Sequence, residues 1–544
     1  MQNTYKRKVI VAVSVIAALA LTAGLVLFKK PWLTQTKDRM LEVLHLQKKV
    51  NVKGDTETLH SNALLERYYK QYGYTQTWSD RSEFYRTMLI SMLNYADSLG
   101  LDPKNYHQDY IEKYDSLITA GKVDLQQFET ENELIFSDAA MSFLFDVAYG
   151  KEIDISFNGV KYNIDTAHIL NMYSDLMLHK NWRRTLDSIE PRIPQYVYLK
   201  TQLNRMNAFL KDFPEADTLT VGNSEAGLIA ASVKLNFYGL VTDSLVGDSS
   251  DALRLSAAIK GFQKMMNIDT SGKLDTKTTA SLNRPLASAM RQMKESLNYW
   301  RWTGRLNEHE FILVNIPAAR LQIVNPDSAK DLSMRVIVGK TSTQTPSFTA
   351  YITKVITYPY WNVPNDIAVK EMLPKIQKSL DYLEANNLQV LDNRGKELDP
   401  TQIKWKTLTP ARFPYRIRQS TGCDNALGVL KFDLNSPYFI YLHDTNRRDL
   451  FTKKDRFMSH GCVRLEKPME LANYVLQDGL DSATVAKLNQ CLRDEKPTSF
   501  ALKKQFPVLI LYLTADVDEN GWLRFYNDVY KLDEEKKAAE RKAV

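Results

Sequence analysis

Two apolar patterns divide the chain into a helical part and a strand-rich part. From about 37 to 240, apolar residues recur every three or four positions, as in Ile135, Ala139 and Phe143. This spacing is typical of helices that bury one face. From Phe311 onward, short runs of β-branched and aromatic residues replace it and indicate strands. The sequence therefore predicts a multidomain α+β protein.

Two shorter helical patterns lie between these parts. Within 251–285, one apolar helical face is followed by a turn at Ser271-Gly272, and Asp275 is a candidate N-cap for a second helix. The next segment, 286–305, is predicted to form an amphipathic connecting helix. Its large apolar residues are three or four positions apart: Leu286, Met290, Met293, Leu297 and Trp300.

The strand-rich part begins with a predicted hairpin and is later interrupted. The strands 311–317 and 321–325 flank a short turn, and further strands are expected at 334–339 and 351–358. The segment 370–406 starts as a helix and continues as a polar, Asn-rich stretch. It is too long for a passive loop, so we expect a lid inserted into the β domain.

The N-terminus carries a candidate membrane segment. Residues 9–28 contain no charge and follow Lys6-Arg7-Lys8. A helix of this length spans about 30 Å, the thickness of a bilayer core, and the positive flank favours a cytoplasmic N-terminus. We expect a cytoplasmic tail over 1–8, an anchor over 9–28 and the remainder outside the cytoplasm. A signal peptide cleaved near Leu21-Thr22-Ala23 is the alternative.

Composition narrows the classes of function. At 544 residues the chain is too long for one core. The formal net charge of +7 comes without a basic cluster, so it does not indicate a nucleic-acid partner.

One stretch carries the candidate chemistry, Ser459-His460-Gly461-Cys462-Val463-Arg464. A cysteine becomes nucleophilic when a nearby base or cation takes its proton, and both His460 and the upstream His443 are candidates. The aromatic and β-branched run 438–442 predicts a buried strand that would mount His443 rigidly. Gly461 permits a sharp turn and leaves amides that an oxyanion would need.

This cysteine has two other interpretations. A lone cysteine is usually a small buried apolar residue, and a cysteine with histidines can bind zinc. Zinc would require further ligands at close spacing, but Cys423 and Cys491 stand alone in the sequence. The residues therefore favour a catalytic thiol, and no metal or cofactor is expected.

The motif Ser-His-Gly-Cys-Val-Arg after a segment that ends in His-Asp-Thr resembles the active-site signature of the L,D-transpeptidases, which have the YkuD fold. Other segments resemble the large YcbB-type members of that family: Arg301-Trp302, 312–317, 336–340, 359–364 and 425–428. Some large members lack a histidine at the position of His460, which makes His443 the favoured base.

The resemblance implies a mechanism. Cys462 would attack a peptidoglycan stem tetrapeptide, expel D-alanine and pass the acyl group to the amine of a second stem. His443 would act as the base, and amides near Gly461, with Tyr441, would hold the oxyanion. Ser459 and His460 would orient the site. Arg464 would bind a substrate carboxylate, with a structural ion pair as an equal alternative.

The resemblance also implies an organisation. We expect a helical scaffold domain over 31–250, a peptidoglycan-binding module over 251–285, a catalytic domain over 306–480 and a C-terminal extension over 481–544. The alternative for 251–285 is an ordinary helical subdomain without a ligand.

The partners follow from this organisation. They would be donor and acceptor stem peptides and, through 9–28, the inner membrane, with the catalytic part in the periplasm. A carboxypeptidase that hydrolyses the same thioester and a non-catalytic wall anchor are the rival functions.

Overall fold

The computed structural model describes most of the chain. The described residues are 37–44, 49–52, 55–78, 83–123, 130–153, 156–157, 164–179, 181–242, 249–306, 310–325, 332–477, 486, 495–518 and 521–532. The expected tail and anchor over 1–28 lie outside these ranges, as do Cys491 and most of 481–494. In the part of the chain that is described, no helix is both long enough and apolar enough to cross a bilayer.

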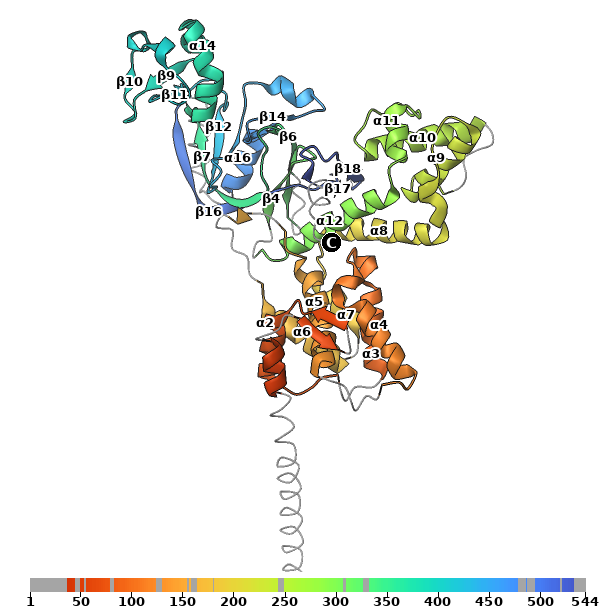
Figure 1. Cartoon of the computed structure of the whole chain (residues 1–544). Coiled ribbons are helices and arrows are strands. Elements are labelled where there is room, and N and C mark those ends of the chain that lie inside the picture. The colour runs from red at the N-terminus through yellow and green to blue at the C-terminus, as the bar shows by residue number, and fades with distance from the viewer. Residues whose placement is uncertain are drawn as a thin grey trace, which may run out of the picture.

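The N-terminal part is a helical bundle, as the apolar spacing predicts. It is built around the buried helix α5 (Thr130–Tyr149), and Figure 1 shows the neighbouring helices gathered around it. Buried acidic groups of α5 are satisfied by backbone: Glu133 accepts from the amides of Thr77 at 2.5 Å and Trp78 at 2.8 Å. The helices around it are α2 (Asn62–Gln71), α3 (Glu83–Asn94), α4 (Gln108–Thr119), α6 (Thr166–His179) and α7 (Trp182–Ile189). The next two helices, α8 (Pro194–Asp212) and α9 (Glu225–Phe237), pack in a second core that they share with residues 255–302.

The connecting region forms as expected. Helices α10 (Ser249–Met265) and α11 (Thr276–Leu282) are joined by a turn, and Asp275 caps α11 by accepting the amide of Thr278 at 2.9 Å. The predicted amphipathic helix is α12 (Leu286–Thr303). Its fully buried Arg301 donates to the carbonyl of Leu99 in the bundle, and its Ser296 donates to the carbonyl of Ala515 in the strand-rich part, so α12 connects the two.

The β domain is a closed barrel. Around the ring the order is β12-β13-β15-β6-β5-β4-β16-β7, and β7 pairs again with β12. Most pairs are antiparallel, whereas β13–β15 and β4–β16 are parallel. Its strands are β4 (Phe311–Asn315), β5 (Arg320–Val324), β6 (Ser333–Gly339), β7 (Phe348–Thr357), β12 (Leu430–Leu434), β13 (Leu442–His443), β15 (Val463–Leu465) and β16 (Thr498–Leu511).

The central strands are apolar on both faces because both faces are covered. In β4, Ile312 and Val314 point into the barrel core, while Leu313 packs in the cluster that contains Met293 and Trp300 of α12. The predicted hairpin β4–β5 is confirmed by its antiparallel register. Shorter elements complete the domain: β3 (Ser156–Phe157) on β7, β14 (Phe457–Ser459) on β6, helix α16 (Pro468–Gln477), and the hairpin β17 (Ala515–Val517) and β18 (Leu523–Phe525).

The expected lid at 370–406 is part of a larger subdomain. A separate sheet, β10-β9-β11-β8, begins at Trp361 and ends at Gln419, and Figure 1 shows it at the far end of the barrel from the helical bundle. Its own apolar core includes Leu373, Val390 and Trp405. We call residues 361–419 the insertion. Its elements are β8 (Trp361–Asn362), α13 (Asn365–Ile367), a π-helical turn (Ala368–Met372), α14 (Leu373–Lys378), α15 (Asp381–Ala385), β9 (Leu388–Leu391), β10 (Glu397–Leu398) and β11 (Arg416–Gln419).

Candidate active site

A cavity of about 900 Å³ lies between the barrel and the insertion. The barrel side contributes the residues singled out from the sequence, together with Lys431: Tyr441, His443, His460, Cys462 and Arg464. The insertion contributes Trp361, Asn362, Asp366, Glu371, Lys375 and Tyr382. The structure thus brings the motif residues into one cavity that has charged groups on both walls. In the part of the chain described, no group of three or more histidine, cysteine or acidic side chains is arranged to hold a metal ion.

The loop that carries Cys462 is a tight connection between β14 and β15. The Ser459 hydroxyl donates to the carbonyl of Cys462 at 2.6 Å and accepts the amide of Gly461 at 3.1 Å. Gly461 has φ of 113°, a conformation that L side chains rarely adopt, so glycine is required here. Ser459 is 1% exposed and acts as the internal brace of the loop.

A neighbouring loop after β6 supports this turn from behind. Thr345 donates its hydroxyl to the carbonyl of Gly461 at 2.8 Å, and Thr343 donates to the carbonyl of Ser459 at 3.1 Å. Both carbonyls of the turn therefore accept a hydrogen bond, and this fixes the direction in which the Cys462 side chain points.

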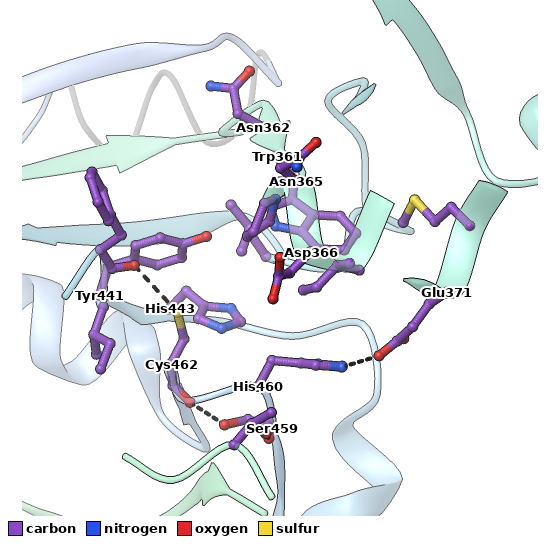
Figure 2. A pocket seen from close by; sticks show the side chains of 18 of the residues that line it. Trp361, Asn362, Asn365, Asp366, Glu371, Tyr441, His443, Ser459, His460 and Cys462 are labelled. Atoms are coloured by element: carbon purple, nitrogen blue, oxygen red, sulfur yellow. Dashed lines mark hydrogen bonds and ion pairs between the residues drawn. The ribbon is translucent and has the colours of Figure 1, made fainter. Parts of the chain in front are cut away.

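His443 lies at the end of β13, where the parallel pairing with β15 sets it opposite Arg464. Its Nδ1 is 2.5 Å from the carbonyl oxygen of Asp444. A carbonyl only accepts, so Nδ1 carries the proton and Nε2 keeps its lone pair. Figure 2 shows the imidazole beside the sulfur of Cys462. Burial, the nearby Arg464 charge and the Lys431 charge lower the pKa of His443 to about 3.

The carboxylate of Asp444 fixes the backbone that orients this histidine. It accepts the amide of Val429 at 3.0 Å and the Arg448 guanidinium at 2.9 Å. Gly428 has φ of 61°, and a Cβ there would collide with this carboxylate. Gly428, in the family-like segment 425–428, therefore leaves the space that the Asp444 carboxylate occupies.

The thiol of Cys462 is protonated at neutral pH. Burial raises the pKa of Cys462, and hydrogen bonds from the backbone and hydroxyl of Tyr441, with the Lys431 and Arg464 charges, oppose the rise only in part. Burial and the adjacent Cys462 also raise the pKa of Tyr441, which keeps this hydroxyl a donor. Thiol and imidazole are thus both neutral at rest.

One expectation about the mount of His443 is wrong. Residues 438–442 do not form a buried strand: β13 contains only Leu442 and His443, and the side chain of Phe439 is 89% exposed. Phe439 has φ of 53°, which turns the chain out of extended geometry and directs its carbonyl toward the Cys462 sulfur, 3.9 Å away. The aromatic residues Tyr438, Phe439 and Tyr441, which suggested a strand, instead form part of the cavity wall.

Gly461 and Arg464 were expected to contact the substrate or an oxyanion, and the structure shows the surroundings of both. The Gly461 amide, expected near an oxyanion, donates to Ser459 instead, whereas the Tyr441 hydroxyl contacts the Cys462 sulfur. Arg464 lines the cavity, and its Nε is buried without a hydrogen-bond partner. Among the described residues Arg464 shows no ion pair, and its role stays a prediction.

His460 points away from Cys462, toward the insertion. Its Nε2 is 2.6 Å from Oε1 of Glu371, and Figure 2 shows the two side chains reaching across the cavity. Sequence reasoning missed Glu371 and Lys431, and it named Trp361 only within the family-like segment 359–364. Nothing local distinguishes Glu371 from a surface residue, because its place in the site depends on how the insertion closes on the barrel.

Comparison with known proteins agrees with this geometry. Residues 309–495 match the model of the L,D-transpeptidase catalytic domain of the YkuD type. This segment, which contains His443 and Cys462, is thus similar to that catalytic domain. Residues 63–203 match the model described as the Scaffold domain. These matches confirm the family resemblance of the motif and the predicted α+β organisation, while peptidoglycan binding by 251–285 stays a prediction.

A Haemophilus influenzae protein named "Putative L,D-transpeptidase" is 39% identical over 232 residues. That match covers 43% of this chain and 46% of the relative, less than half of either. Two solved structures are each 12% identical with a TM-score of 0.18, too low to carry an argument. They are an L,D-transpeptidase from Mycobacterium smegmatis, covering 37% of this chain and 58% of that one, and the Ldtfm-avibactam carbamoyl enzyme, covering 40% and 61%.

Proposed function

We propose that this chain is a cysteine-dependent L,D-transpeptidase that forms 3→3 crosslinks between peptidoglycan stem peptides. The observation that carries the proposal is the convergence of Cys462, His443 and Tyr441 in one cavity. The family match supports the acyl-transfer class, and a periplasmic substrate agrees with the charge-free segment over 9–28.

The neutral resting pair sets the order of events in acylation. As the Cys462 sulfur attacks the carbonyl carbon of the donor stem, its proton passes to Nε2 of His443. The Tyr441 hydroxyl stabilises the oxyanion. When the carbon–nitrogen bond breaks, His443 returns the proton to the leaving amine of D-alanine, and a thioester on Cys462 remains.

Arg464 supplies the substrate contact on the barrel wall. Its Nε is buried without a partner, and an unpaired buried donor is costly unless a ligand satisfies it. A carboxylate of the donor stem suits this position, because a guanidinium binds carboxylates through charge-assisted hydrogen bonds.

The test is to incubate the purified chain with stem tetrapeptide and to quantify three products. Free D-alanine reports acylation, crosslinked dimer reports transfer, and tripeptide reports hydrolysis. We expect dimer, together with an acid-stable adduct on the peptide that contains Cys462. Tripeptide without dimer would identify a carboxypeptidase, and no D-alanine release would leave a wall-binding protein.

A further inference from the structure

The contact between Glu371 and His460 joins two parts of the chain that are far apart in sequence. His460 belongs to the loop of the nucleophile, and Glu371 belongs to the insertion. The 2.6 Å contact links them across the cavity, with the His460 side chain 34% exposed and that of Glu371 45% exposed. The pair therefore sits at the solvent side of the site, whereas His443 is buried.

The local helix geometry places Glu371 there. The turn Ala368–Met372 is π-helical, and such a turn inserts an extra residue and re-aims the side chains on it. Val369 and Met372 are buried in the insertion, while Glu371 projects from the opposite, exposed side. Figure 2 shows Asp366 pointing into the same space. The insertion thus presents acidic groups at the solvent side of the cavity.

The second half of the reaction has a proton balance that His443 alone does not meet. An alkyl amine arrives in water as an ammonium, since its pKa is near 10. It must lose one proton before its nitrogen is nucleophilic, and a second proton after the nitrogen has attacked the thioester. Water, by contrast, needs no prior deprotonation.

The second of these protons can be accepted by His443 and Cys462. As the new carbon–nitrogen bond forms and the carbon–sulfur bond breaks, the electron pair stays on sulfur. The proton from the nitrogen passes through His443 to the Cys462 sulfur and restores the thiol. The first proton must go to solvent, and a base that contacts both cavity and solvent is suited to this task.

We propose that His460, oriented by Glu371, removes the first proton from the acceptor ammonium and passes it to solvent. Glu371 is the positioning residue: its carboxylate holds Nε2 of His460 and leaves Nδ1 for the incoming amine. This assignment rests on the acyl transfer proposed above and makes the pair the determinant of amine transfer over hydrolysis. The charged or titratable groups that line the cavity around the pair are Asp366, Lys375 and Tyr382 of the insertion, Tyr360 next to it, and Lys431, Tyr438, Tyr441, His443, Cys462 and Arg464 of the barrel side.

The experiment compares His460→Gln, Glu371→Gln and a matched control in the full chain. The amide introduced by His460→Gln still offers Glu371 a hydrogen-bond donor but has no basic nitrogen, so this variant separates a base from a mere tether. Glu384→Gln makes the same charge change as Glu371→Gln on an exposed residue of the insertion that does not line the cavity. For each variant the ratio of dimer to tripeptide is measured against total D-alanine release.

We expect the ratio to fall by about 100-fold in His460→Gln, the loss typical of a missing general base, and by a smaller factor in Glu371→Gln. D-alanine release should fall far less. The ratio of dimer to tripeptide should recover in both variants as the pH approaches the pKa of the acceptor amine, near 10, because the amine is then unprotonated without a base. It should also recover when hydroxylamine, which is unprotonated at neutral pH, replaces the stem as acceptor and gives a hydroxamate.

Other outcomes would overturn one proposal or the other. An unchanged ratio in His460→Gln, with normal D-alanine release, would show that the pair only tethers the insertion. A low ratio that neither pH nor hydroxylamine restores would show a loss of acceptor binding instead. Absence of D-alanine release from the unmodified chain would contradict the proposed function itself, independently of His460.

Discussion

At the scale of single residues, the site keeps the proposed nucleophile, Cys462, and the proposed base, His443, uncharged. Burial raises the pKa of Cys462 and lowers that of His443, so a thiolate–imidazolium pair is disfavoured at rest. Reactivity must then depend on substrate that binds and triggers the proton transfer. Such a thiol is protected from adventitious reagents while the cavity is empty.

The first prediction concerns the identity of the nucleophile. Cys462→Ala should abolish D-alanine release while the fold is preserved, because one small side chain replaces another small side chain at a half-buried position. Cys423→Ala, a matched change at an exposed cysteine outside the cavity, should leave the rate unchanged. Circular dichroism checks the fold of both variants. Crosslinking by a folded Cys462→Ala protein would refute the assignment.

The second prediction concerns His443. His443→Ala should lower D-alanine release by roughly 100- to 10,000-fold, as expected for a missing general base. Because the pKa of His443 lies at about 3, its base form persists to low pH. The acylation rate of the unmodified chain should therefore stay flat between pH 7 and about 5. A decline with a midpoint near 6.5, the ordinary imidazole value, would show that a different histidine acts.

At the scale of elements, one histidine of the bundle holds three segments together. His107 lies between a short 3₁₀ turn and α4, and its ring nitrogens are 2.6 Å from Glu57 and 2.8 Å from Asp138 of α5. Burial by itself would lower the pKa of His107, but the two hydrogen-bonded carboxylates outweigh it and raise the pKa to about 9. The charged form is thus part of the folded bundle.

The third prediction follows from this raised pKa. The stabilising charge is fully present below the unfolded pKa of about 6.5 and is lost as the pH rises through 9. The melting temperature of the bundle should therefore fall between about pH 6.5 and 9.5. His107→Gln should melt lower at the acid end of this range and should lose most of the slope. Equal slopes in the two proteins would mean that the ion pairs contribute nothing.

Local elements were predictable from the sequence, and distant contacts were not. The hairpin β4–β5, the helix α12 and the cap at Asp275 depend on neighbouring residues, and the structure has them as expected. The run 438–442 was a wrong prediction because strand propensity does not reveal the positive φ of Phe439, which ends the extended geometry. Glu371 could not be found, because its partner is 89 positions away.

At the scale of the whole molecule, the insertion is an independent lobe. Its core closes on itself, and its first and last strands pair at Asn362 and Arg418. Removing only 376–404 would delete Leu383, Leu388 and Val390 from that core and would expose the rest. A clean deletion must therefore remove the lobe where its two ends already meet.

The fourth prediction uses this boundary. Replacing 363–417 with Asn-Gly, a two-residue turn that suits an antiparallel pair, should leave the barrel folded. D-alanine release should persist, since Cys462, His443 and Tyr441 belong to the barrel. The ratio of dimer to tripeptide should fall, because water is no longer excluded and Glu371 is lost. An unchanged ratio would show that the insertion has no part in acceptor choice.

The position of β16 in the barrel has a consequence for the timing of activity. This strand lies between β4 and β7, yet it is made after every residue of the site. Until Thr498–Leu511 emerges, the ring stays open and the strands that carry the thiol and the imidazole have no closed support. During synthesis, therefore, the barrel cannot close around the site before β16 has been made. We therefore expect the proposed activity to require this closing strand, so a chain that ends before it should not release D-alanine.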